Sequence, residues 1–196
     1  MGPDDLRRAL PRGTGVSSDF DLNPGTVLPT GHVLRPAAVL IAVWDRPEGA
    51  RLILTKRSSR LAHHPGQIAL AGGKIDAGDA GPEAAALREA EEEIGLPPAI
   101  VQVLGVLPAH ETVTGYSVIP VLAHIAGDFT ACPEAGEVDE VFTVPLAHVL
   151  NPAHYRVEGR RWRGEMRHYY VVPYGPYYIW GATARILRGL AERLAK

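Results

Sequence analysis

A run of glutamates on one short helix constrains the fold of this chain more than any other feature. The segment 87–96 reads LREAEEEIGL, in which four of five consecutive positions are glutamate. Pro82 suits the first turn of a helix, and Gly95 with the two prolines after it suits the end, so the sequence predicts a helix over 82–94. Like charges three or four residues apart weaken a helix by about 0.2–0.5 kcal/mol per pair. The glutamates therefore need a compensating partner.

The glutamates divide into two sets around the predicted helix. At about 100° per residue, Glu89, Glu92 and Glu93 share one face, and Glu91 falls near the edge of the apolar stripe. Arg88 stands one turn before Glu92 and can neutralise part of this cluster. The expected apolar stripe lies roughly opposite and consists of Leu87, Ala90 and Ile94.

The three-carboxylate face has two interpretations. One is a solvated acidic surface. The other is a cation site, because carboxylate oxygens are ligands that Mg²⁺ and Mn²⁺ prefer and a bound cation replaces repulsion by coordination. The helix alone leaves both open.

Elsewhere the pattern is dominated by strands. The segments 37–44 and 50–57 flank a turn and predict a β-hairpin. A terminal helix is predicted over 183–196 and a short one within 1–10. Many strands with two substantial helices predict an α+β or α/β sandwich. Further strands are expected at 66–73, 101–107, 116–125 and 137–146, with a strand–turn–strand unit at 155–172.

Composition narrows the functional class. The chain has 196 residues, of which 46% are hydrophobic and 21% charged, so we expect an ordered chain with one globular core. A formal net charge of −2 gives no global basic field, and we expect no nucleic-acid partner. The start of the chain lacks the apolar region of a signal peptide and the apolar runs are too short to cross a membrane, so we expect a cytoplasmic protein without a membrane partner.

The residues around the glutamates match a known motif. The segment 72–96 resembles the Nudix box, Gly-x5-Glu-x7-Arg-Glu-U-x-Glu-Glu-x-Gly-U, where U is apolar. Positions 88–96 fit without exception. The first half departs, since Asp79 stands in place of the first glutamate and eight residues, instead of seven, separate it from Arg88. A one-residue loop insertion explains this, and no role is carried over to Asp79.

The segment before the box, 54–76, looks like the signature of the coenzyme A diphosphatase branch of the Nudix family. That branch has Phe-Pro where this chain has Leu70-Ala71. The resemblance covers most of residues 36–190 and implies an α+β Nudix fold, an α/β/α sandwich around a mixed sheet. It implies a Nudix domain at 31–196 behind an N-terminal helix and loop at 1–30. The matching positions are Leu54, Thr55, Arg57, Ser58, Gly66, Gln67, Gly72 and Gly73.

The resemblance also implies an activity. Nudix hydrolases use Mg²⁺ or Mn²⁺ and water to cleave a nucleoside diphosphate linked to another group, and coenzyme A would give 3′,5′-ADP and 4′-phosphopantetheine. The alternatives are another substrate, such as ADP-ribose, NADH or a damaged nucleotide, or a non-catalytic domain that only binds nucleotides. The partner is a small nucleotide, and the oligomeric state is left open, with a homodimer as one alternative.

Roles for individual residues follow from the resemblance. Glu89 and Glu93 are the expected metal ligands, with the carbonyl of Gly73, and Glu92 is a further ligand or the base for the attacking water. Arg88 is expected to orient a carboxylate. Glu111 and Glu137 are candidate bases outside the box. Arg57 is the expected contact for the 3′-phosphate of coenzyme A, and the substrate-binding set is Arg57, Ser58, Gly66, Gln67 and His64.

A cluster of aromatic residues near the C-terminus has two interpretations. Such residues could stack on a base, but more often they pack a sheet against a helix, which we favour. The basic segment 156–168 carries one tryptophan, and alone it is weak evidence for RNA contact. The aromatic cluster consists of Tyr169, Tyr170, Tyr174, Tyr177, Tyr178 and Trp180.

Overall fold

Two long strands form the centre of the fold in the computed structural model, which describes residues 2–10, 15–26, 33–162 and 164–195. The strands β2 (Arg35–Arg46) and β3 (Gly49–Arg57) form the predicted antiparallel hairpin. On its other side β2 runs parallel to β8 (Tyr116–Ile125). The centre of the sheet is therefore mixed.

The described residues contribute nine strands to this sheet. Parallel pairs occur between β2 and β8 and between the two-residue strands β1 and β7, whereas the other pairs are antiparallel. Along the main path the order is β1 (Ser17–Ser18), β7 (His110–Glu111), β8, β2, β3, β4 (Ile68–Ala69). Off this path, β5 (Gly72–Lys74) pairs with β2, β6 (Val101–Val106) with β8, and β9 (Val138–Pro145) with β3.

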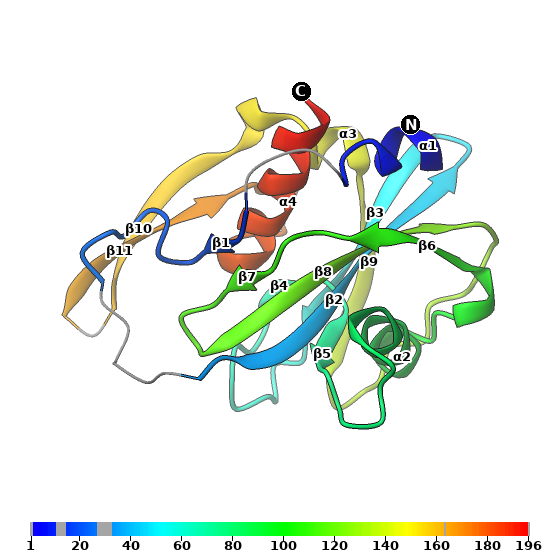
Figure 1. Cartoon of the computed structure of the whole chain (residues 1–196), viewed down its shortest axis with the longest axis horizontal. Helices are drawn as coiled ribbons and strands as arrows, with labels where there is room; N and C mark the ends of the chain where they lie inside the picture. The colour runs from blue at the N-terminus through cyan, green and yellow to red at the C-terminus, as the bar shows by residue number, and fades with distance from the viewer. Residues whose placement is uncertain (1, 11–14, 27–32, 163, 196) are drawn as a thin grey trace.

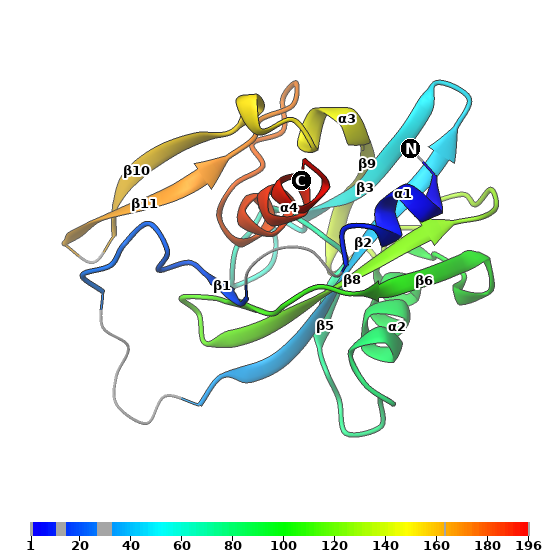
Figure 2. The same ribbon diagram turned by 45° about the horizontal axis from the view of Figure 1, so that its top comes forward.

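Helices cover both faces of the sheet (Figures 1 and 2). Side chains alternate across a strand, so Leu40 of β2 joins the apolar cluster around α2 (Pro82–Ile94). Its neighbour Ile41 joins the cluster around α4 (Gly181–Leu194). This arrangement is the predicted α/β/α sandwich around a mixed sheet.

The helix α2 has the predicted bounds because its end signals are local. Pro82 occupies the first turn. Gly95 ends the helix with φ 69°, a left-handed conformation that suits glycine, and its N–H bonds to the carbonyl of Glu91 at 2.9 Å. The single strand predicted at 66–73 is wrong, because the chain changes partner there: β4 pairs with β3 and β5 pairs with β2.

The remaining elements frame the sheet. The strands β10 (Arg156–Trp162) and β11 (Glu165–Val171) form a separate antiparallel ribbon beside α4 (Figure 1). The short helix α1 (Pro3–Arg7) packs near β6 with Leu6 fully buried. Among the described residues, no helix is both long and apolar enough to cross a membrane. Three short helical turns complete the fold: η1 (Pro98–Ile100), α3 (Leu146–Val149) and η2 (Pro152–His154).

Candidate active site

Glu93 is a buried carboxylate directed at the backbone of β5. It is 5% exposed, and one of its oxygens accepts a hydrogen bond from the N–H of Gly72 at 3.1 Å. Burial raises its pKa to about 7. The negative charges of Glu89 and Glu137 contribute to this rise in pKa, and the hydrogen bond from Gly72 and the charge of Arg57 oppose it. The site therefore holds more negative charge than its own hydrogen bonds compensate.

Glu89 lies against the same short strand. Its side chain is 16% exposed, and burial raises its pKa above the ordinary value. A β-carbon added to Gly73 would lie 2.5 Å from the Oε1 atom of Glu89, so a side chain there would displace the carboxylate. Glycine at this position lets the carboxylate approach the backbone.

Arg88 connects the acidic groups of the box. Its Nη1 atom donates to Glu89 and to Glu92, both at 3.0 Å. Its Nε and Nη2 atoms donate to the two oxygens of Asp79, each at 3.0 Å, as a bidentate pair. The hydrogen bonds from Arg88 lower the pKa of Asp79. Asp79, for which no role is expected from the box motif, therefore anchors the arginine that orients Glu89.

The expected three-carboxylate face is wrong in detail. The buried face of α2 includes Ala86, Ala90 and Glu93, so Glu93 does not lie opposite the apolar residues. Glu92 is 60% exposed at its side chain and is paired with Arg88. In the described part of the chain, no three His, Cys, Asp or Glu residues converge as a ready metal cluster.

The residues that do converge suit a divalent cation. Glu89 is a partly buried carboxylate and Glu93 a buried one. Both have raised pKa values, and both lie beside the backbone of β5. Hard oxygen donors and uncompensated negative charge are the chemistry that Mg²⁺ and Mn²⁺ take. The fit is to these two carboxylates, and Glu92, which is exposed and paired with Arg88, stands outside it.

The two candidate bases lie in different places. The backbone carbonyl of Glu137 accepts a hydrogen bond from the N–H of Ser58 at 2.8 Å. The charge of the Glu137 carboxylate raises the pKa values of Glu89 and Glu93. Glu111 lies on β7, which is separated from β5 by β8 and β2. Of the two, only Glu137 has an electrostatic link to the box.

The segment before the box forms a folded loop. Arg57 pairs in register with Val138, and its N–H bonds to the carbonyl of Gln67 at 2.9 Å. Ser58 is fully buried, and its hydroxyl oxygen accepts from the N–H of Arg60 at 3.3 Å. Ser58 therefore shapes the loop in this structure, and the substrate contact expected of it stays a prediction.

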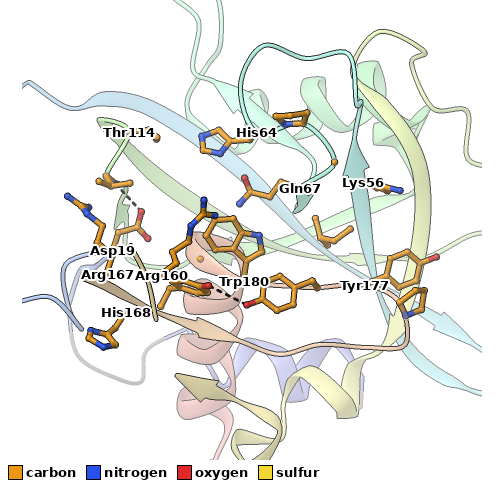
Figure 3. Close-up of a pocket in the computed structure, with 18 of the residues that line it drawn as sticks. Asp19, Lys56, His64, Gln67, Thr114, Arg160, Arg167, His168, Tyr177 and Trp180 are labelled. Carbon is orange, nitrogen blue, oxygen red and sulfur yellow. Dashed lines mark hydrogen bonds between the residues drawn. The ribbon is translucent and has the colours of Figure 1, made fainter. Parts of the chain in front are cut away.

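A pocket of about 880 Å³ opens beside this loop (Figure 3). Three of the predicted substrate-binding residues, His64, Gly66 and Gln67, line it. Arg57 is not among the lining residues; its charge acts on Glu93, in the box, and on His64, in the pocket. The volume suits a ligand of nucleotide-derivative size.

The opposite wall comes from the β10–β11 ribbon and the segment before α4. Arg160 stands 5.7 Å from the ring centroid of Trp180, and Tyr169 meets the same ring edge-on at 5.0 Å. The sequence analysis missed Arg160, and it named Trp180 only as a member of the aromatic cluster, for which packing was favoured over base stacking. The predicted strand at 156–162 could have identified Arg160. Successive side chains of a strand point to opposite faces, so Arg160 and its neighbour Arg161 lie on the two faces of the ribbon.

The aromatic cluster divides between two roles. Tyr170 and Tyr174 pack against the core, as the favoured interpretation predicts. Four of its members line the pocket, and Tyr177 among them also packs against the core: Tyr169, Tyr177, Tyr178 and Trp180.

Comparisons with known proteins agree with this geometry. The family model described as NUDIX domain matches residues 34–163. The uncharacterized Nudix hydrolase NudL of Escherichia coli strain K12 is 45% identical over 160 residues, which are 82% of this chain and 83% of that protein. NudL of Shigella flexneri is 45% identical over 166 residues, 85% of each chain.

Solved structures show the same fold. The Nudix hydrolase RenU of M. smegmatis has a TM-score of 0.51 and 26% identity, over 62% of this chain and 83% of its own. The NUDIX domain of Shewanella oneidensis NrtR, solved with ADP ribose, has a TM-score of 0.54 and 16% identity, over 87% of this chain and 96% of its own, a likeness of fold alone. The box geometry, the extent of the family match and the identity to NudL together establish that this chain belongs to the Nudix hydrolase family.

Proposed function

We propose that the protein hydrolyses the pyrophosphate bond of coenzyme A, or of a coenzyme A derivative, to 3′,5′-ADP and 4′-phosphopantetheine. One observation carries the proposal. The segment that resembles the coenzyme A diphosphatase signature reaches from the box to the pocket, because Arg57 acts on Glu93 at one end and Gln67 lines the pocket at the other.

The pocket offers positive charge despite the net charge of −2. Lys56, Arg160 and Arg167 line it. Coenzyme A carries a 3′-phosphate in addition to its pyrophosphate, and guanidinium groups bind phosphate through charge-assisted hydrogen bonds. These basic residues of the pocket lining therefore favour a substrate that carries a second anionic group.

The departure at Leu70-Ala71 does not remove a group from the pocket. Both residues are 5% exposed, Leu70 in the core under α4 and Ala71 in the core under α2. The substitution of the branch's Phe-Pro is therefore a change in packing, and the coenzyme A assignment does not depend on it.

Nudix hydrolases generally use a divalent metal ion, which Glu89, Glu93 and the backbone of Gly73 would hold here. When bound, such an ion neutralises phosphoryl oxygens and lowers the pKa of the attacking water. Arg88 fixes the orientation of Glu89. Arg57 draws the charge of the pyrophosphate toward the box. Glu137 accepts the proton of the attacking water as general base, a role that its position beside the box carboxylates supports.

The test is hydrolysis by the purified protein of coenzyme A, ADP-ribose, NADH and 8-oxo-dGTP, each with Mg²⁺ or Mn²⁺, with products identified by mass. We expect the highest kcat/KM for coenzyme A, with release of 3′,5′-ADP. A higher value for another dinucleotide would leave the enzyme class intact and remove the coenzyme A assignment.

A pair of variants links the activity to the box. Glu93→Gln should lower turnover by about two orders of magnitude or more, because it removes one charge from the cation site. Glu83→Gln is the matched control, since Glu83 is exposed on the same helix and should leave turnover unchanged. Near-normal turnover in Glu93→Gln would favour a site elsewhere in the chain.

A further inference from the structure

The N-terminal segment 15–26 contributes to the pocket although it lies outside the residues that match the family model, 34–163. Two of its residues, Asp19 and Asn23, are part of the pocket lining. In Figures 1 and 2 this segment runs beside the β10–β11 ribbon. The pocket wall is therefore completed by a part of the chain with no place in the box chemistry.

Specific hydrogen bonds hold this segment in position. The side-chain amide of Asn23 donates to the carbonyl of His168 and accepts from its N–H, both at 2.8 Å, as a partner strand would. Asp21 pairs with Arg185 of α4 at 2.8 Å. Ser17 and Ser18 form β1 parallel to β7. The segment is thus attached to three different elements.

Asp19 is oriented by groups behind the pocket wall. Its Oδ1 atom lies 3.0 Å from Nε2 of the fully buried His110, and its Oδ2 atom accepts from the N–H of Val113 at 2.9 Å. The Nδ1 atom of His110 in turn meets the hydroxyl of Ser17 at 3.0 Å. The Asp19 side chain remains 19% exposed. Each carboxylate oxygen has a second lone pair, so Asp19 can still accept a hydrogen bond from a ligand.

We propose that Asp19 determines specificity by accepting a hydrogen bond from the nucleoside part of the substrate. A carboxylate accepts hydrogen bonds and repels phosphate, whereas the same pocket offers Lys56 and Arg160 to anionic groups. Figure 3 draws Asp19 at one side of the pocket, with Arg160 and Arg167 on the same side, and Lys56 at the other. A nucleotide whose phosphates contact these basic groups and whose N–H or O–H donor faces Asp19 matches this lining.

Two nucleoside groups supply such a donor: the exocyclic amine of adenine and a ribose hydroxyl. The inference rests on the proposed function only in taking a nucleotide derivative as the ligand. His110 is a positioning residue, because it acts on the ligand through Asp19.

The first experiment uses the unaltered protein and needs no catalysis. Calorimetry in EDTA would compare adenosine 3′,5′-bisphosphate with two analogues, inosine 3′,5′-bisphosphate and 2′-deoxyadenosine 3′,5′-bisphosphate. We expect one analogue to bind roughly tenfold more weakly, because each lacks one donor and hydrogen bonds to charged groups are the strong ones. A loss with the inosine compound identifies the amine, and a loss with the deoxy compound identifies the hydroxyl. Equal binding of all three compounds, or binding of none, overturns the proposal.

The second experiment assigns the discrimination to Asp19. In Asp19→Asn the amide can donate as well as accept, so the preference for the parent compound should shrink to about twofold or less. Asp21→Asn is the matched control, because it makes the same charge change in the same segment, where Asp21 pairs with Arg185. Full discrimination in Asp19→Asn, or equal loss in Asp21→Asn, contradicts the assignment.

The outcomes separate this inference from the proposed function. If coenzyme A is hydrolysed but the three probes bind alike, the function stands and the role of Asp19 fails. If the probes discriminate through Asp19 but coenzyme A is not cleaved, the nucleoside contact stands and the substrate assignment fails.

Discussion

The Glu93 carboxylate accepts a hydrogen bond from the backbone N–H of Gly72 at 3.1 Å, which ties the box helix to the glycine strand that precedes it. Gly72 has φ 153°, and an added β-carbon would lie 2.3 Å from the carbonyl oxygen of Ala38. Glycine is therefore required at that point of β5, and the strand approaches both β2 and the helix. The position of the carboxylate follows from this close packing.

The burial of Glu93 predicts a pH-dependent stability of the metal-free protein. Its folded pKa of about 7 lies above the ordinary 4.5. The unfolded state therefore loses its proton first as the pH rises, and ionisation in the buried site destabilises the fold. Stability should fall between about pH 4.5 and 7, by at most about 3 kcal/mol for a shift of this size.

Denaturant unfolding in EDTA across this pH range measures the effect. The Glu93→Gln variant cannot ionise at this position, so its free energy of unfolding should not show the fall that is due to Glu93. Parallel pH profiles for the variant and the unaltered protein would mean that Glu93 does not titrate there.

Gly73→Ala should impair catalysis more than stability. The added β-carbon would lie 2.5 Å from the end of the Glu89 side chain, which can move away at small cost to the fold but then leaves its position. Displacement of a catalytic group by about 1 Å can cost on the order of 100-fold in rate. We expect such a loss in kcat, with a fall in unfolding free energy of about 1 kcal/mol.

Gly78→Ala is the control for this substitution. Gly78 lies in the same loop-and-helix region, has no atom within 4 Å of an added β-carbon, and does not have a positive φ. Its activity should match the unaltered protein. Equal activity in Gly73→Ala, measured as kcat with saturating metal, would argue against a role for Glu89.

The elements that were predicted correctly are those with local signals. The bounds of α2 follow from Pro82 and Gly95, and β8 has the bounds expected from its continuous apolar run. The strands β1 and β7 were missed because each has two residues and exists only through pairing with a distant segment. Such pairing leaves no periodicity in the sequence.

The candidate site was predicted in its chemistry but not in its arrangement. The helical projection put Leu87, Ala90 and Ile94 on the buried face, whereas the structure buries Ala86 with Ala90 and Ile94 and leaves Leu87 half-buried. Small side chains face the sheet because they allow the close approach. Asp19 could not be assigned, and Trp180 was named only within the aromatic cluster, because the pocket brings the two together from distant parts of the chain.

Arg88→Lys should weaken the metal affinity of the enzyme. Lysine keeps the charge but loses the fork that joins Asp79 to Glu89. Substitutions of groups that orient metal ligands typically cost 10- to 100-fold, so we expect the Mg²⁺ concentration for half-maximal activity to rise by roughly tenfold. The kcat at saturating metal should change less.

A second arginine provides the comparison. Arg188 pairs with Glu192 at 2.9 Å on α4, so Arg188→Lys makes the same chemical change away from the box. Its metal dependence should be that of the unaltered protein, as measured by activity and by direct Mn²⁺ binding. An unchanged metal dependence in Arg88→Lys would show that the fork does not orient a ligand.

Arg160→Ala should raise the KM for coenzyme A by about tenfold, because its guanidinium lines the pocket wall and is proposed to bind the 3′-phosphate. The KM for 3′-dephospho-coenzyme A should change little, since that compound lacks the phosphate. Arg161→Ala is the control, because the adjacent side chain is not part of the lining and points to the other face of the ribbon.

Arg57→Ala should weaken the binding of both substrates alike, since Arg57 acts on Glu93 beside the reacting bond. If Arg160→Ala raised both KM values equally, or Arg57→Ala alone discriminated between the two compounds, the 3′-phosphate would belong to Arg57, as the sequence resemblance implies.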